Sequence, residues 1–152
     1  MTRQRGMTLV ELVITIVIIG IAAAALFSAM ASITARSSDP LLRQQSLSLA
    51  EAYLEEVLLQ AYLDPATGTA CPSPPAQRGD YDTVCDYAGL TDAGARNARG
   101  EAIAGLGAYT VAVSVAPQAW GGLPASDVFY IEVAVTDPAS QTLVLGGYRT
   151  RY

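Results

Sequence analysis

Glu11 constrains what this chain can do more than any other residue, because it is the only charge within a long apolar segment. A carboxylate inside an apolar helix that lies in a membrane costs about 2.5–3.5 kcal/mol, so such a group needs a partner. The next cation toward the C-terminus is Arg36, and Arg5 lies six residues toward the N-terminus. Pairing with Arg5 is one option, and we favour a cationic group of a second chain.

The residue types present exclude several kinds of catalytic and binding site. The chain has 152 residues, with nine arginines, no lysine, no histidine, 14 acidic residues and a net charge of −5. Without histidine there is no Ser-His-Asp or Cys-His nucleophile and no His-ligated zinc, and two cysteines are too few for a zinc site built from four cysteines. An acidic chain also lacks the cationic face that binds phosphates. We therefore expect no enzyme activity, no cofactor and no nucleic-acid partner.

Residues 7–35 form the element that carries Glu11, and 22 of these 29 residues are apolar. The 24 uncharged residues between Glu11 and Arg36 would span about 36 Å as a helix, enough to cross a bilayer core of about 30 Å. Two arginines among the first five residues predict a cytoplasmic N-terminus, so residues 36–152 would lie outside the cytoplasm. A cleaved signal peptide is the alternative, but its apolar core is only about 7–15 residues long.

A second helix is predicted over residues 41–63. Asp39 and Pro40 suit the cap and first turn of a helix, so the chain should restart or kink there. Asp64-Pro65 should end it. Its apolar positions recur at helical spacing and should pack against a sheet: Leu47, Ala50, Leu54, Val57, Leu58 and Ala61. Its glutamates are expected on a solvated face: Glu51, Glu55 and Glu56.

Residues 108–152 are predicted to form an antiparallel meander. Apolar and polar residues alternate over 109–115 and 129–135, as they do on strands with one buried face. A third run follows, in which Gly146 and Gly147 suggest a bulge. The expected fold class is α+β, in which a long N-terminal helix packs on a small antiparallel sheet. The first half of that helix is transmembrane and the second half is amphipathic.

The connection over residues 64–107 is long and rich in Pro, Gly, Ala and Asp. A structureless connection of this length is unusual in a compact domain, so something should hold it in place. Outside the cytoplasm Cys71 and Cys85 can form a disulfide, and closing a 15-residue loop stabilises a fold by about 3 kcal/mol. We expect this disulfide rather than two free thiols.

The same connection carries carboxylates that raise the question of calcium: Asp80, Asp82, Asp86 and Asp92. Oxygen-rich loops hold Ca²⁺, but the twelve-residue spacing of an EF-hand and its closing glutamate are absent. We expect no metal site, and expect these carboxylates to cap turns or to pair with arginines of the loop. Those arginines are Arg78, Arg96 and Arg99. A calcium site at Asp80, Asp82 and Asp86 is the alternative.

Residues 5–12, Arg-Gly-Met-Thr-Leu-Val-Glu-Leu, resemble the N-terminal signal of type IV pilins and type II secretion pseudopilins. In that family a short basic leader ends in Gly, and Glu occupies the fifth mature position. The resemblance implies that prepilin peptidase removes the leader 1–6 by cutting between Gly6 and Met7, and that Met7 is N-methylated. Met is less common than Phe at the first mature position. Glu11 of one subunit would then neutralise the Met7 amine of a neighbour, since two buried charges are tolerated best as a pair.

The same resemblance implies a type IV pilin fold, partners and a location. The partners are other pilin subunits, through helix 7–35, prepilin peptidase and the inner-membrane assembly platform. The location is the inner membrane, with a cytoplasmic N-terminus and a periplasmic C-terminal domain, and afterwards the extracellular filament.

Further segments resemble minor pilins of the mannose-sensitive haemagglutinin (MSHA) type: residues 36–42, 49–56, 81–87 and 147–150. The implied function is therefore that of a minor pilin in an MSHA-type pilus. A type II secretion pseudopilin shares the leader and stays an alternative. So does a single-pass membrane binding module that never polymerises, which would need neither the cut at Gly6 nor Glu11.

Overall fold

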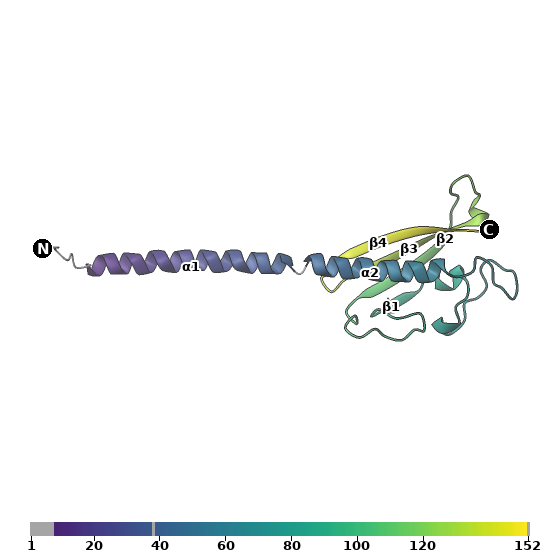
Figure 1. Ribbon diagram of the computed structural model, residues 1–152, viewed down its shortest axis with the longest axis horizontal. Coiled ribbons are helices and arrows are strands. Elements are labelled where there is room, and N and C mark those ends of the chain that lie inside the picture. The colour runs from purple at the N-terminus through teal and green to yellow at the C-terminus, as the bar shows by residue number, and fades with distance from the viewer. Residues whose placement is uncertain (1–7, 38, 152) are drawn as a thin grey trace. The chain divides into compact units, whose positions relative to one another are not determined.

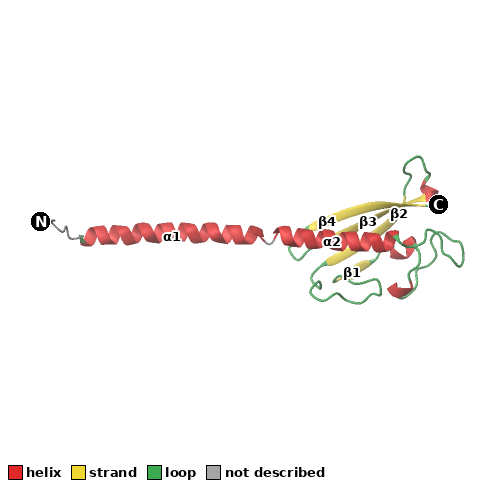
Figure 2. Cartoon of the chain, viewed as in Figure 1, coloured by secondary structure: helices red, strands yellow, loops and turns green. Residues whose placement is uncertain are grey.

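The computed structural model describes residues 8–37 and 39–151, which form an α+β arrangement (Figures 1 and 2). The elements are α1 Leu9–Ser37, α2 Asp39–Leu58, η1 Arg78–Asp80, η2 Val84–Tyr87, β1 Thr91–Ala93, β2 Thr110–Pro117, η3 Ala125–Asp127, β3 Val128–Thr136 and β4 Thr142–Thr150. The predicted fold class, a long apolar N-terminal helix followed by a small antiparallel sheet, is confirmed. The chain divides into two compact units, residues 1–41 and 42–152.

Helix α1 has the length and composition of a membrane-spanning helix. Its segment Leu9–Ala31 has a mean hydropathy of 2.7, and none of these residues is buried. Large apolar side chains are exposed along it, among them Leu9, Ile18 and Phe27. Apolar exposure on this scale indicates that lipid or other helices cover α1.

Helix α2 begins at Asp39, where the sequence predicted a restart, but it ends at Leu58 instead of Leu63. The predicted C-terminal end was wrong because tertiary bonds replace helical ones. Ala61 donates its N–H to the carbonyl of Asp82 at 3.1 Å and accepts the N–H of Val84 at 3.1 Å. Such bonds to a distant segment leave no signal in helical periodicity.

One face of the sheet forms the core with α2 (Figure 2). The strands follow the order β1-β2-β3-β4 and all pairs are antiparallel, with Val111 opposite Val135 and Val113 opposite Val133. The buried face of α2 includes Ala50, Leu54 and Val57 of the predicted apolar stripe. It comprises Ser46, Leu49, Ala50, Tyr53, Leu54 and Val57. Leu47 is exposed, whereas the sequence placed it in the apolar stripe.

Strand β4 is regular through Gly146 and Gly147, so the predicted bulge was wrong. Glu132 lies opposite Gly146, and Ile131 lies opposite Gly147. The two glycines instead make room for neighbours. A Cβ on Gly146 would overlap the ring of Tyr130, and one on Gly147 would sit 3.4 Å from the methyl groups of Leu54.

Candidate functional site

Glu11 lies in the first turn of α1, and Thr8 immediately precedes this helix. The Thr8 hydroxyl accepts the backbone N–H of Glu11 at 3.3 Å, and the Thr8 carbonyl accepts the N–H of Leu12 at 3.2 Å. Thr followed three residues later by Glu is the pattern of a capping box, in which a side chain satisfies a free N–H of the first turn. The sequence reasoning above missed this role of Thr8, although the Thr-x-x-Glu spacing carries it.

The carboxylate of Glu11 is exposed on α1 and is the only charge in the segment Leu9–Ala31. No salt bridge to Glu11 occurs among the side chains that the structure describes, those of residues 8–31 and 40–151. A carboxylate favours a helix N-terminus because of the helix dipole, but this gain is below about 1 kcal/mol at an exposed site. That gain is smaller than the cost of about 2.5–3.5 kcal/mol for placing such a charge in an apolar medium.

Gly6 and Met7, the residues predicted to flank the cleavage site, lie outside the described residues. The same is true of Arg5, the intramolecular option for pairing with Glu11. The cut and the methylation therefore stay predictions.

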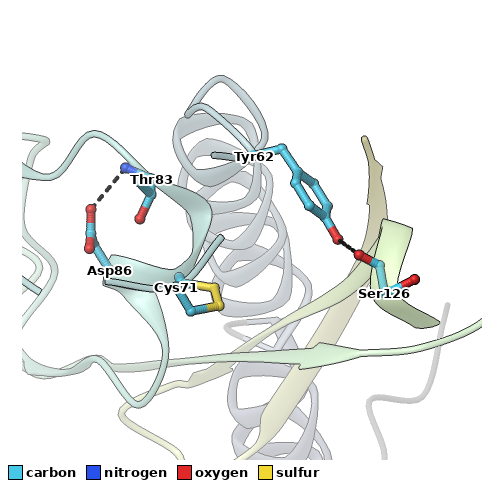
Figure 3. The surroundings of a disulfide bond; sticks show 6 residues. Tyr62, Cys71, Thr83, Asp86 and Ser126 are labelled. Carbon is cyan, nitrogen blue, oxygen red and sulfur yellow. Dashed lines mark hydrogen bonds between the residues drawn. A yellow bond between two sulfur atoms is a disulfide. The ribbon is translucent and has the colours of Figure 1, made fainter. Parts of the chain in front are cut away.

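The predicted disulfide between Cys71 and Cys85 is confirmed (Figure 3). It joins Cα atoms 5.2 Å apart and ties the otherwise irregular segment after α2 to η2. Cys85 is buried and Cys71 is exposed. The bond closes beside the pairing of Ala61 with Thr83, so one end of the long connection is held by covalent and backbone bonds together.

The aspartates suggested as a calcium alternative do not converge. The carboxylate of Asp86 turns back to accept the backbone N–H groups of Asp82 at 3.1 Å and Thr83 at 2.8 Å, as Figure 3 shows for Thr83. Asp80 and Asp82 are exposed. Within the described ranges no three His, Cys, Asp or Glu side chains form a group that could hold a metal ion. Asp86 acts instead as the turn cap that the sequence favoured.

An arginine network fixes the same connection onto α2. The expected pairing of loop carboxylates with loop arginines is confirmed for Asp92 with Arg78, whereas the pairing of Arg78 with Glu56 was not predicted. Arg78 donates from Nε to Oε1 of Glu56 at 3.1 Å and from Nη2 to Oε2 at 3.0 Å. Its Nη1 donates to Oδ2 of Asp92 at 2.5 Å. The expectation that Glu56 lies on a solvated face was wrong, because this bidentate pair draws it under the loop. Glu51 and Glu55 are exposed as expected.

Two tyrosines complete the network. The hydroxyl of Tyr53 donates to Asp92 at 2.8 Å and accepts the backbone N–H of Arg96 at 2.7 Å. The hydroxyl of Tyr87 donates to Glu56 at 2.8 Å. The guanidinium of Arg78 also lies 4.6 Å from the centre of the Tyr53 ring, in cation–π range.

Burial sets the protonation of these groups. Burial works against the charge of Arg78, but hydrogen bonds to Glu56 and Tyr53 outweigh it and raise the pKa of Arg78. Burial raises the pKa of Tyr53. Burial and the hydrogen bond to Glu56 raise the pKa of Tyr87. The arrangement holds Arg78 charged and both phenols neutral. Its donors and acceptors therefore hydrogen-bond to one another, and these bonds stabilise the loop.

The comparisons with known proteins bear on the N-terminus. A family model described as the prokaryotic N-terminal methylation motif matches residues 1–27. No curated protein matches the chain. No solved structure matches it. The motif match supports a type IV pilin-like or pseudopilin-like protein that prepilin peptidase processes, with a membrane-anchored N-terminal helix. This signal is typical of structural pilin and pseudopilin subunits.

Proposed function

We propose that this chain is a minor pilin, a low-abundance subunit of a type IV pilus of the MSHA type. The observation that carries the proposal is the methylation motif over residues 1–27, which runs into an apolar helical segment, Leu9–Ala31, with one charge, Glu11. Prepilin peptidase would cut between Gly6 and Met7 and methylate the new amine of Met7.

The physical argument for assembly is the pairing of two charges. The cut exposes a cationic amine at Met7 on the residue before Thr8, four positions ahead of Glu11. A carboxylate and an amine are each costly in an apolar medium, and both costs fall when they pair between subunits. The exposed apolar side chains of α1 supply the surface on which neighbouring helices pack. Assembly would thus depend on processing, because the amine exists at that position only after the cut.

The partners proposed are other pilin subunits through helix 7–35, prepilin peptidase and the inner-membrane assembly platform. Before assembly the chain would sit in the inner membrane, with the sheet domain in the periplasm. The arginines near the N-terminus support this orientation, because cationic residues stay on the cytoplasmic side. The disulfide supports it too, since disulfides persist outside the cytoplasm.

The MSHA assignment rests on sequence resemblance alone, in residues 36–42, 49–56, 81–87 and 147–150. A type II secretion pseudopilin is the second candidate, since the matched motif is common to pilins and pseudopilins. Recovery of the chain from sheared surface pili supports the pilus subunit. Recovery only with a periplasmic secretion pseudopilus supports the pseudopilin.

The experiment that tests assembly replaces the carboxylate. Glu11→Ala should insert into the membrane normally but be lost from sheared filaments by at least tenfold. Glu55→Ala, at an exposed position of α2, is the matched control and should enter filaments as the wild type does. Normal incorporation of Glu11→Ala would argue for a membrane binding module that does not polymerise through this charge.

A further inference from the structure

Strand β4 is a free edge of the sheet. It pairs with β3 alone among the described strands, and it comprises nine residues, Thr142–Thr150 (yellow in Figure 1). The opposite edge is β1, with only three residues. None of the β4 residues is buried, and Val144 is 53% exposed. A long exposed edge strand presents a row of unpaired backbone groups.

The register shows which backbone groups these are. Asp137 donates its N–H to the carbonyl of Gln141 at 2.9 Å, and Arg151 donates to the carbonyl of Asp127 at 2.9 Å. These two pairs bracket the β3–β4 ladder, and hydrogen-bonded pairs alternate with non-bonded ones along an antiparallel ladder. The residues that turn N–H and C=O away from β3 are therefore Thr142, Val144, Gly146, Tyr148 and Thr150. No backbone bond to a described residue uses these groups.

Of the features by which proteins block strand pairing, the edge carries only an inward-pointing charge, Arg149. Exposed edges are commonly protected by proline, lysine, a bulge or an inward-pointing charge. Strand β4 has no proline and no lysine, its register is regular, and its one charged residue is Arg149. The guanidinium of Arg149 bonds the carbonyl of Gln60, on the α2 side of the sheet. The edge is therefore open to a further strand.

A cavity lies beside each end of this edge. The first is about 260 Å³ and is lined by Arg43, Ser46, Asp137, Gln141, Thr142, Leu143 and Val144. The second is about 440 Å³ and is lined by Leu58, Trp120, Tyr148, Arg149 and Thr150. An added strand sends every second side chain toward the helix side, where such cavities receive it.

The charges at the edge oppose those of the domain. Residues 42–152 contain twelve acidic residues and six arginines, yet exposed arginines stand at both ends of β4, namely Arg43 and Arg151. Asp137 lines the first cavity too, but it is buried and its Oδ1 accepts the N–H groups of Ala139 and Gln141. At the other end Asp127 lies opposite Arg151 and is half-buried. The fully exposed charged side chains at the two ends are thus the arginines, which favours an acidic occupant.

We propose that β4 is a docking edge for an extended, acidic peptide segment of a partner protein, which adds to the sheet as a fifth strand. The outward backbone groups of Val144, Gly146 and Tyr148 bond its backbone, and Arg43 and Arg151 attract carboxylates near its two ends. A second copy fits less well. Antiparallel pairing of two β4 strands would bring Arg43 of one copy near Arg151 of the other. This inference goes beyond the proposed subunit function and does not depend on it.

The test uses the full chain in detergent micelles and a peptide probe. The probe has nine residues, alternating threonine and valine with aspartate at each end, and a twin has lysine at each end. Calorimetry should show that the aspartate peptide binds at least tenfold more tightly than its twin. Amide hydrogen exchange should slow at Val144, Gly146 and Tyr148 in its presence. Equal binding of the two peptides, or no binding, would overturn the proposal.

Two variant pairs locate the site. Val144→Pro removes one outward N–H and should weaken binding at least tenfold, whereas Val144→Thr keeps the N–H and should change it less than twofold. If Val144→Pro fails to fold, the second pair of variants, which changes the charges at the edge, tests the proposal. The double variant Arg43→Glu, Arg151→Glu should abolish the preference for aspartate, and Arg99→Glu, an exposed arginine of the loop, should leave it intact. Self-association through β4 that excludes the peptide would instead make a second copy the occupant and overturn the proposal.

Discussion

Arg78 and Glu56 face one another through two parallel hydrogen bonds, Nε to Oε1 at 3.1 Å and Nη2 to Oε2 at 3.0 Å. Their side chains are only 6% and 15% exposed, and they join η1 to α2 across 22 residues of sequence. Fork-to-fork pairs of this kind fix orientation as well as charge. The long connection after α2 is therefore held at two places, by this pair and by the disulfide.

Removing Arg78 should destabilise the sheet domain strongly. Arg78→Met leaves the carboxylates of Glu56 and Asp92 without their cation, and breaking a buried pair in this way costs about 3–5 kcal/mol. Urea unfolding of the full chain in detergent measures the loss. The matched control is Arg99→Met at an exposed loop position, which should stay within about 0.5 kcal/mol of the wild type. A loss below about 1 kcal/mol in Arg78→Met would show that the network contributes little.

The stability of the domain should fall at alkaline pH. Burial raises the pKa of both Tyr53 and Tyr87 in the folded chain, whereas tyrosines of the unfolded chain lose their protons near pH 10. The unfolded state then binds fewer protons, so the free energy of unfolding is level below about pH 10 and decreases as the pH rises further. Tyr87→Phe should make this decrease shallower. Unfolding titrations at a series of pH values check the slope, and an unchanged slope in Tyr87→Phe would contradict the assignment.

Loss of the disulfide should destabilise the domain by about 3 kcal/mol, the value for a loop of this length. The double variant Cys71→Ser, Cys85→Ser tests this, and the reduced wild type should match it. Substitution of the cysteines and reduction of the wild type open the same loop, so they should lower the urea midpoint of unfolding equally. A reduced wild type as stable as the oxidised protein would mean that the loop is held without the bond.

The two glycines of β4 should respond differently to the same added methyl group. Gly146→Ala pushes the ring of Tyr130 away and should cost about 1–2 kcal/mol. It should also change the fluorescence of Trp120, whose ring stacks on Tyr148 at 4.9 Å, because Tyr130 contacts Tyr148. Gly147→Ala meets Leu54 at ordinary contact distance and should be nearly neutral. Equal effects of both variants would contradict the packing.

The sequence predicted the elements that depend on local pattern. The apolar run Leu9–Ala31, the alternation in β2 and β3 and the disulfide all follow from composition or spacing. The end of α2 and the burial of Glu56 did not, since both depend on contacts with residues far along the chain. No periodicity shows that Arg78 will meet Glu56, because a lone arginine in an irregular loop looks like any exposed cation.

At the N-terminus of α1, the spacing of Thr8 and Glu11 is enough to predict the helix cap, although the sequence analysis did not use it. The sequence could not predict that β4 is an edge strand, because the position of a strand in the sheet depends on tertiary pairing. The glycines were misread for a related reason. Their neighbours across the sheet, and not their own backbone, explain why a side chain is absent.

The proposed subunit is processed at Gly6 and built into a filament. Mass spectrometry of the N-terminal peptide from sheared surface filaments tests it most directly. We expect a chain that begins at Met7 and carries one methyl group on its amine. An uncut chain with residues 1–6 intact, found in the inner membrane and absent from filaments, would contradict it.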